Sequence, residues 1–302
     1  MSLPFKHLTS AKQLTPEVIE SIFATAEEME MLSESGRGDT LKNKVIALLF
    51  YEPSSRTMLS FQSAVQRLGG GMILAQGREG SSLLKGESIE DTIQMVSGYS
   101  DLIVMRHPEG GAADKAASVS TVPFVNAGDG GNEHPTQAAL DLYTLKKEFG
   151  RLDNLHIAFG CDPLHSRTIR SLATVLSQFE GNKFTFIGPE SLKASEDLKS
   201  LLDESGVNFE ETDDLSKGVE ADILYMNRLQ EERFVDHSEF EKYRKLFVLT
   251  ADMLQDKNVL IMNPLPRIDE IEIAVDSLPN AAYFKQARNG VPIRMALLSM
   301  MA

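Results

Sequence analysis

The chain has 302 residues, of which 42% are hydrophobic and 25% charged, a composition typical of an ordinary globular protein with two domains. Its 30 basic and 44 acidic residues give a formal net charge of −14, which argues against a protein that binds mainly nucleic acid or an anionic membrane. A small anionic ligand is compatible with this charge, because a few clustered arginines can dominate the local potential.

Along the chain, short apolar runs of strand length alternate with helical patterns. The predicted strands are 45–51, 102–105, 122–126, 156–160, 183–188, 222–226, 246–249 and 259–262. The predicted helices cover 18–29, 57–68, 134–149, 166–179, 190–205 and 291–302. Continuously apolar strands separated by helices predict an α/β fold with mostly parallel sheets flanked by helices. The longest apolar run, 45–51, is far shorter than the ~20 residues that a membrane helix needs.

A polar stretch, KKEFGRLDN at 146–154, separates two halves of this pattern. It predicts a first domain over 1–149 and a second over 150–285, with the C-terminal helix 286–302 returning to the first. Ligands of open α/β sheets bind beyond the carboxyl ends of the strands. We therefore expect the site in a cleft between the two domains.

The segment 52–57 (EPSSRT) joins a predicted strand to the start of a predicted helix. Free backbone N–H groups and the helix dipole at such a junction favour an oxyanion. Ser54, Ser55 and Thr57 add hydroxyl donors, and the planar fork of Arg56 matches phosphate geometry. The alternative is plain helix capping by serine and threonine. Neither a Walker motif nor a GxGxxG loop supports a nucleotide site.

Three further clusters lie in the first half. The loop 81–88 is rich in serine and glycine and carries one lysine, although it could be only a solvated surface loop. Arg106 comes at the carboxyl end of a strand, where open sheets place ligands. The glycine-rich turn 126–133 opens a helix on which His134 and Gln137 share one face. An ordinary surface histidine is the alternative for His134.

The second half places polar side chains just beyond its own strands, at Arg167, Arg228, Gln230 and the stretch 264–267. Together the two halves predict a cleft for two anionic ligands, one phosphate-like and one rich in carboxylates. No carboxylate pair, nucleophile–base pair or metal-ligand cluster stands out. The chemistry should therefore depend on positioning and charge stabilisation, without metal or cofactor.

These motifs, in this order, resemble the aspartate/ornithine carbamoyltransferase family over nearly the whole chain. The resemblance runs through SSRTMLSF, MRHP, NAGDG, EHPTQ, HSRT, LYMNRLQEER and PLPR. The stretch 228–233 is similar to the aspartate branch. Membership implies carbamoyl transfer from carbamoyl phosphate to L-aspartate, giving N-carbamoyl-L-aspartate and phosphate in pyrimidine synthesis.

The resemblance also implies roles for individual residues. Residues implied to bind the phosphate are Ser54, Ser55, Arg56, Thr57 and Arg106. Arg56, Thr57 and His134 would polarise the carbamoyl carbonyl, and Gln137 would bind its amino group. Pro264 and Leu265 would supply backbone contacts to the carbamoyl group. Arg167, Arg228 and Gln230 would bind the aspartate carboxylates. Ser81 and Lys85 would reach a neighbouring subunit's site in a homotrimer, where Lys85 would contact both substrates. Regulatory chains are possible partners.

The chain departs from the family pattern at Ser55, Leu84, Asn263 and Cys161, without losing an implied ligand group. Two alternatives stay open: a carbamoyltransferase for another amine such as ornithine, and a catalytically silent assembly subunit. Cys161 is the only cysteine, which excludes an internal disulfide and favours a reducing compartment. The N-terminal residues lack the apolar core of a secretory signal. We therefore expect a cytoplasmic protein in which Cys161 is a buried packing residue.

Overall fold

The computed structural model describes residues 2–36, 38–77, 86–231, 234 and 237–302. Packing divides the chain into two compact units, Met1–Tyr143 with Asn289–Ala302, and Thr144–Arg288. The chain leaves the first unit within helix α5 (Pro135–Phe149) and returns to it within helix α9 (Tyr283–Met301). Within the described ranges, no helix has the length and apolar character needed to cross a membrane.

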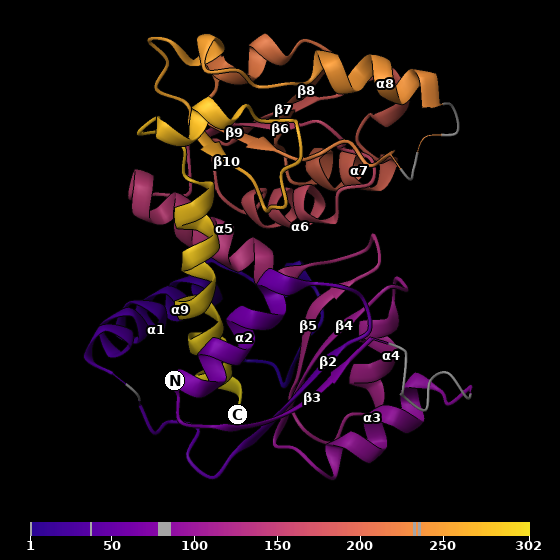
Figure 1. Ribbon diagram of the computed structural model, residues 1–302, viewed down its shortest axis with the longest axis vertical. Helices are drawn as coiled ribbons and strands as arrows, with labels where there is room; N and C mark the ends of the chain where they lie inside the picture. Colours follow the sequence, from indigo (N-terminus) through magenta and orange to yellow (C-terminus); the bar gives the residue numbers. More distant parts are fainter. Residues whose placement is uncertain (1, 37, 78–85, 232–233, 235–236) are drawn as a thin grey trace. The chain divides into compact units, whose positions relative to one another are not determined.

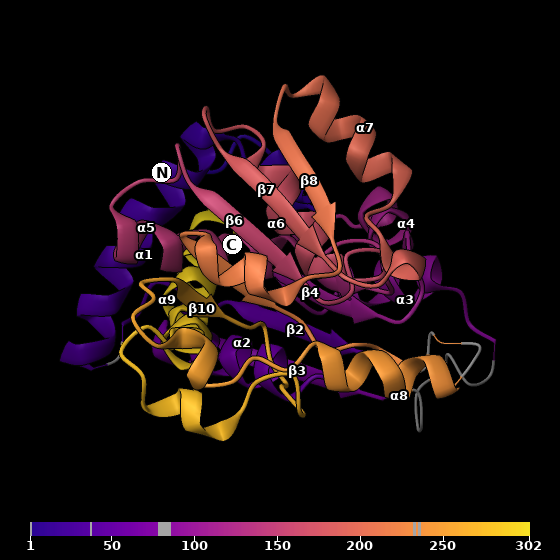
Figure 2. The same cartoon turned by 90° about the horizontal axis from the view of Figure 1, so that it is seen from above.

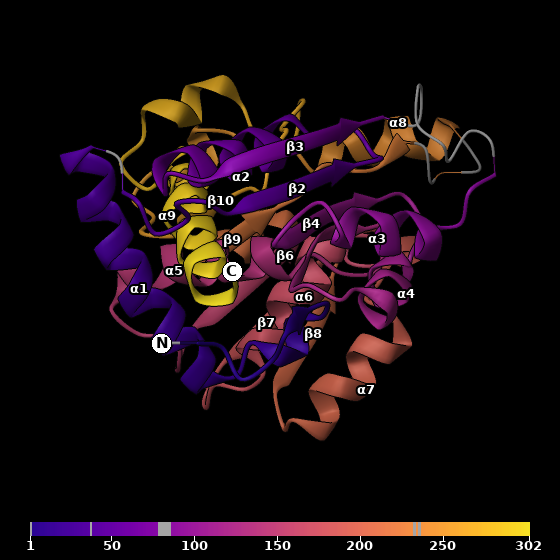
Figure 3. The same cartoon turned by 90° about the horizontal axis from the view of Figure 1, so that it is seen from below.

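The first unit contains a five-stranded parallel sheet in the order β1-β5-β4-β2-β3. Its strands are β1 (His7–Leu8), β2 (Val45–Phe50), β3 (Gly71–Gln76), β4 (Leu102–His107) and β5 (Phe124–Asp129). Its other helices are α1 (Pro16–Ser35), α2 (Ser55–Arg67), α3 (Ile89–Ser97) and α4 (Ala112–Val119), with a 3-10 turn η1 (Ala11–Gln13). Helices α3 and α4 lie side by side on one face of the sheet (Figures 1 and 3). Ile93 and Ala112 pack there against Leu49 and Met105 of the strands.

The second unit repeats this architecture with the strand order β10-β9-β6-β7-β8, all parallel. Strands β6, β7 and β8 lie side by side in Figure 2. Its strands are β6 (His156–Gly160), β7 (Lys183–Ile187), β8 (Asn208–Thr212), β9 (Ile223–Met226) and β10 (Leu260–Met262). Its helices are α6 (Arg167–Leu176), α7 (Glu196–Glu204) and α8 (His237–Leu246), with the 3-10 turns η3 (Glu190–Leu192), η4 (Leu215–Glu220), η6 (Asp252–Leu254) and η7 (Ile273–Ser277). Phe159 packs against Phe184, Phe186 and Tyr225 of neighbouring strands.

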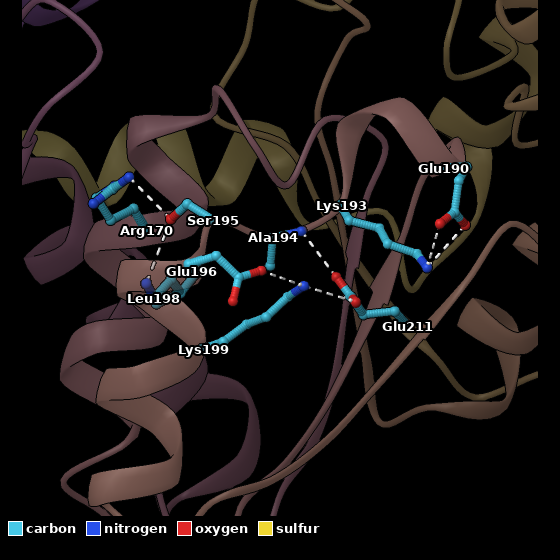
Figure 4. Close-up of polar contacts among 9 residues, drawn as sticks. All are labelled: Arg170, Glu190, Lys193, Ala194, Ser195, Glu196, Leu198, Lys199 and Glu211. Atoms are coloured by element: carbon cyan, nitrogen blue, oxygen red, sulfur yellow. Dashed lines mark hydrogen bonds and ion pairs between the residues drawn. The ribbon is translucent and has the colours of Figure 1, made fainter.

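Polar contacts fix the connection between β7 and α7 (Figure 4). Ser195 caps α7 by accepting from Leu198 N at 3.4 Å, and Arg170 Nη2 of α6 donates to the same hydroxyl at 3.1 Å. Glu211 of β8 accepts from Ala194 N at 2.9 Å and lies 3.1 Å from Lys199 Nζ. The connection is therefore tied to both a neighbouring helix and a neighbouring strand.

The alternating α/β pattern is confirmed, but several predicted elements are wrong in detail. The predicted strand at 246–249 is absent, because α8 takes up Leu246 and only Leu249 forms an isolated bridge, to Ile271. The predicted helix 190–205 is two elements, since Ser195 caps a new helix. Strands β1, β3 and β8 and helices α3, α4 and α8 were not predicted.

The last helix begins earlier than predicted, at Tyr283, and contains Pro292. A proline inside a helix removes one backbone hydrogen bond and costs about 3 kcal/mol. The apolar residues that follow, from Ile293 to Leu298, are almost all fully buried, and this packing offsets that cost.

Candidate active site

The turn after β2 leads into the N-terminus of α2, as the sequence predicts. Ser54 occupies the N-cap position in an extended conformation, but its side chain makes no capping hydrogen bond. Thr57 is buried in the first turn, whereas Ser55 and Arg56 are exposed. Partial desolvation lowers the pKa of the Arg56 guanidinium, although the residue as a whole is exposed. The capping alternative is therefore weakened, because Ser54 does not cap.

The helices that carry candidate residues in their first turns have no acidic residue there. Helices α1, α3, α4 and α7 begin with at least one acidic residue, which the positive end of a helix dipole favours. Helices α2, α5 and α6 have none, and α9, which has none either, carries no candidate. Arg56 and Arg167 instead add positive charge to two of these ends. In a chain with a net charge of −14, this arrangement favours an anionic ligand there.

Arg106 lies at the carboxyl end of β4 and links two neighbouring segments. Its Nε is 2.8 Å from Glu52 Oε2, and its Nη1 donates to Ala127 O of β5 at 3.5 Å. The backbone of Arg106 also accepts from Tyr51 N at 2.9 Å. These contacts hold the guanidinium at the same sheet edge as the start of α2.

Asp129 organises the glycine-rich turn before α5. This buried carboxylate accepts from Gly111 N at 2.9 Å, from Asn132 Nδ2 at 3.1 Å and from Glu133 N at 3.1 Å. Gly130 has a φ of 52°, and a Cβ there would lie 2.7 Å from Gly110 N, so only glycine fits. The sequence pattern indicates this turn, but the anchoring role of Asp129 was not predicted.

His134 and Gln137 are both buried at the start of α5. Gln137 Nε2 donates to Asp141 Oδ1 at 2.9 Å, one helical turn later. The first unit therefore gathers the start of α2, Arg106 and the His134–Gln137 turn at the carboxyl edge of one sheet. Ser81 and Lys85 lie outside the described residues.

In the second unit, Asp162 anchors the loop that follows β6. Its buried carboxylate accepts from His165 N at 3.0 Å and from Gln230 Nε2 at 3.1 Å. Burial raises the pKa of Asp162, and hydrogen bonds from His165 and Gln230 oppose that rise. Asp162 thereby brings Gln230 to the loop that precedes α6, a role that was not predicted from the sequence.

Asn227 brings the segment after β9 to the N-terminus of α6. Its Nδ2 donates to Ser166 Oγ, the cap of α6, and lies 3.3 Å from Thr168 Oγ1. Arg167 directly follows Ser166, and Arg228 directly follows Asn227, so the contact brings the two arginines close in the fold. Both arginines are half-buried. The second unit therefore gathers its three candidates, Arg167, Arg228 and Gln230, at the carboxyl edge of its own sheet.

Asn263, which departs from the family pattern, is buried and hydrogen bonded through both atoms of its side-chain amide. Its Nδ2 donates to Glu270 Oε1 at 2.9 Å, and its Oδ1 accepts from Leu265 N at 2.6 Å. Leu265 has a φ of 59°, a left-handed conformation that costs a residue of this type roughly 1–3 kcal/mol. Asn263 and Glu270 therefore hold the strained backbone of the Pro264–Leu265 pair.

Cys161 lies at the end of β6, inside the core of the second unit, and it is fully buried. Burial raises the pKa of its thiol well above the ordinary value, with Glu270 and Asp162 adding to the rise. This environment is that of an inert packing residue.

Two family models match the chain. The carbamoyl-phosphate-binding domain of aspartate/ornithine carbamoyltransferases matches residues 6–147, and the aspartate/ornithine-binding domain matches residues 153–301. The chain belongs to the aspartate/ornithine carbamoyltransferase family.

Relatives with aspartate carbamoyltransferase names align over nearly the whole chain. The catalytic subunit from Methanococcus vannielii is 46% identical over 298 residues, which cover 98% of both proteins. The chloroplastic enzyme of Arabidopsis thaliana is 48% identical over 96% of this chain and 76% of its own length.

Solved structures agree. The catalytic subunit of the Methanocaldococcus jannaschii aspartate transcarbamoylase superimposes with a TM-score of 0.92 at 44% identity, over 98% of both chains. The Trypanosoma cruzi enzyme in complex with N-(phosphonacetyl)-L-aspartic acid gives 0.92 at 35% identity, over 99% of this chain and 96% of that one. The family and fold expected from the sequence are confirmed.

Proposed function

We propose that this chain is an aspartate carbamoyltransferase catalytic subunit, which transfers the carbamoyl group of carbamoyl phosphate to L-aspartate in pyrimidine synthesis. The observation that carries the proposal is that α2, α5 and α6 begin without acidic residues in a chain of this family. Both substrates are anions, and these helix starts supply positive potential at the carboxyl edges of both sheets.

The first unit is assigned to carbamoyl phosphate. The phosphate ligands are Ser54, Ser55, Arg56, Thr57 and Arg106, joined by Ser81 and Lys85 from a neighbouring copy. His134 acts with Arg56 and Thr57 on the carbamoyl oxygen, while Gln137 binds the amino group. Because negative charge builds on that oxygen as the aspartate amine attacks, donors aimed there lower the barrier.

The second unit is assigned to L-aspartate. Arg167, Arg228 and Gln230 bind its two carboxylates, with Lys85 contributing from the neighbouring copy. Backbone groups of Pro264 and Leu265 contact the carbamoyl group. The attacking amine must lose a proton, and we assign the departing phosphate as its acceptor. That one cleft holds both substrates stays a prediction.

We infer that the active form is a homotrimer with shared sites. Strand β3 is an edge strand of its sheet, and its apolar Ile73 and Leu74 are 38% and 45% exposed. Leu59, on α2, is 57% exposed. An apolar edge strand normally requires a cover, and a second copy of the chain provides one. Ser81 and Lys85 follow this strand in the sequence, and the family resemblance implies that they reach the site of the neighbouring copy.

The test is release of phosphate from carbamoyl phosphate with L-aspartate or with ornithine, together with the native mass. Turnover with aspartate alone supports the proposal. Turnover with ornithine would favour a carbamoyltransferase that uses another amine. A folded trimer that is inactive with both aspartate and ornithine would be a catalytically silent assembly subunit. Cytoplasmic location and association with regulatory chains remain proposals, to be checked by fractionation and co-purification.

Shared sites have a separate test. Lys85→Ala and His134→Ala subunits should each be nearly inactive alone. After dissociation and mixing, activity should return, because some interfaces then combine an intact Lys85 with an intact His134. Verified mixing without any recovery would place each site within one chain.

A further inference from the structure

Gln137 is held in one orientation by Asp141. A carboxylate only accepts hydrogen bonds, so the 2.9 Å contact with Asp141 Oδ1 requires the amide nitrogen of Gln137 to face Asp141. Its other amide atom, Oε1, is an acceptor. The carbamoyl amino group that Gln137 is assigned to bind can only donate. The orientation seen here is therefore the one that the substrate needs.

Arg294 of α9 is buried in the first unit, beside Leu140 of α5, the residue that precedes Asp141. Its guanidinium lies over the ring of Phe61 of α2, 5.0 Å from the ring centroid. Burial lowers the pKa of Arg294 to about 9, the negative charge of Asp141 opposes this, and the positive charge of Arg106 adds to it. Arg294 thus lies within electrostatic reach of both Asp141 and Arg106.

The packing of α9 leaves space for this guanidinium. A Cβ at Gly290 would overlap Nη1 of Arg294 and would lie 3.3 Å from Leu140 Cδ2 of α5. Glycine at this position therefore lets the arginine fold back along its own helix beside α5. The guanidinium therefore lies beside the helix that carries Asp141, where its positive charge attracts the carboxylate that accepts from Gln137.

We propose that Asp141 and Arg294 are positioning residues that fix the Gln137 amide with Oε1 facing the carbamoyl amine. This inference rests on the proposed function. It specifies how the same site distinguishes carbamoyl phosphate, which has an amino group, from an analogue that has a methyl group in its place. Neither residue contacts substrate, and both act through Gln137.

The experiment compares carbamoyl phosphate with acetyl phosphate, which has a methyl group in place of the amine. The readout is the ratio of the acetyl phosphate inhibition constant to the KM of carbamoyl phosphate, at saturating aspartate. One hydrogen bond contributes about 0.5–1.5 kcal/mol, so the amine should account for a roughly 2- to 10-fold preference. Asp141→Asn, which can donate as well as accept, should remove most of it.

Two further variants keep the test independent of folding. Arg294→Lys keeps the positive charge but loses the planar guanidinium, so it should partly lower the ratio of the acetyl phosphate inhibition constant to the KM of carbamoyl phosphate. Arg288→Lys, on an exposed position of the same helix, should leave the ratio unchanged. In a Gln137→Ala background, Asp141→Asn should have no further effect on the ratio.

The outcomes are distinguishable. An Asp141→Asn enzyme that is folded and active with an unchanged ratio overturns the inference and leaves the proposed function standing. A lower melting temperature with an unchanged ratio likewise shows a purely structural role. Absence of turnover in the unmodified enzyme would instead overturn the proposed function.

Discussion

The two units share an architecture but build their candidate sites differently. In the first, Thr57, His134 and Gln137 are buried side chains in or next to the first turns of α2 and α5. In the second, Arg167 begins α6, but Arg228 and Gln230 are half-buried residues of an irregular segment that Asp162 and Asn227 hold through side-chain contacts. A site on regular elements is more rigid than one on loops. If the proposed function holds, this difference predicts a preformed phosphate site and an adaptable aspartate site.

The sharpest way to test this contrast is to remove Arg56. Arg56→Ala should lower kcat by about 10²–10³, because one donor to the developing oxyanion is lost. Phosphate affinity, measured by calorimetry without aspartate, should fall as well. Lys42→Ala, an exposed site in the same unit, is the matched control. Normal turnover in a folded Arg56→Ala enzyme would show that the N-terminus of α2 does not belong to the active site.

The second unit should respond differently. Arg228→Ala should raise the KM for aspartate by about 10- to 100-fold, since a hydrogen bond to a charged group contributes roughly 1.5–3 kcal/mol. Carbamoyl phosphate affinity without aspartate should not change. If that affinity falls as strongly as in Arg56→Ala, the division of labour between the units is wrong.

Local patterns explain why the candidate site was more predictable than parts of the fold. Arg56, Arg106 and Arg167 could be found because polar residues after apolar runs mark strand ends. The edge strand β3 was missed because its side chains are largely exposed, whereas buried strands give the clearer signal. Strand β1 has only two residues and forms through pairing with β5, which no local pattern encodes.

The anchoring residues were missed for a related reason. Asp129 and Asp162 look like ordinary turn residues in the sequence. Their partners, such as Gly111 for Asp129 and Gln230 for Asp162, are distant along the chain. Only the fold brings these groups together, so their function could not be inferred from spacing.

Asn263 offers a test of the strained backbone in the second unit. Asn263→Ala removes the partner of Leu265 N and one of the partners of Glu270, and it should lower the free energy of unfolding by about 1–3 kcal/mol. Turnover should fall as well, because the Leu265 backbone loses its support. Chemical denaturation and kcat measure the two effects. Asn208→Ala, at an exposed position, is the control, and equal stability in the two variants would mean that Asn263 does not hold this loop.

The smallest expected effect concerns His156, which begins β6 at the edge of the sheet opposite the candidate residues. Thr185 donates to Glu210 Oε1 at 3.0 Å, so His156 Nε2 is the donor in its 2.8 Å contact with Thr185 Oγ1. The pKa of His156 lies below its ordinary 6.5, mainly because the ring is partly buried and secondly because Lys183 is positively charged. The negative charges of Asp222, Glu210 and Glu220 oppose this shift.

Between the lowered folded pKa and 6.5, the unfolded chain binds more protons at His156 than the folded one. The free energy of unfolding should therefore fall as the pH drops through this window, and His156→Asn should reduce that fall. Denaturation curves at pH 7 and at successive values below 6.5 measure the difference. The KM for aspartate should follow the same pH profile in both proteins, because His156 is remote from the carboxyl edge of its sheet. A changed KM profile would mean that the aspartate site depends on the whole second sheet and not only on the loops at its carboxyl edge.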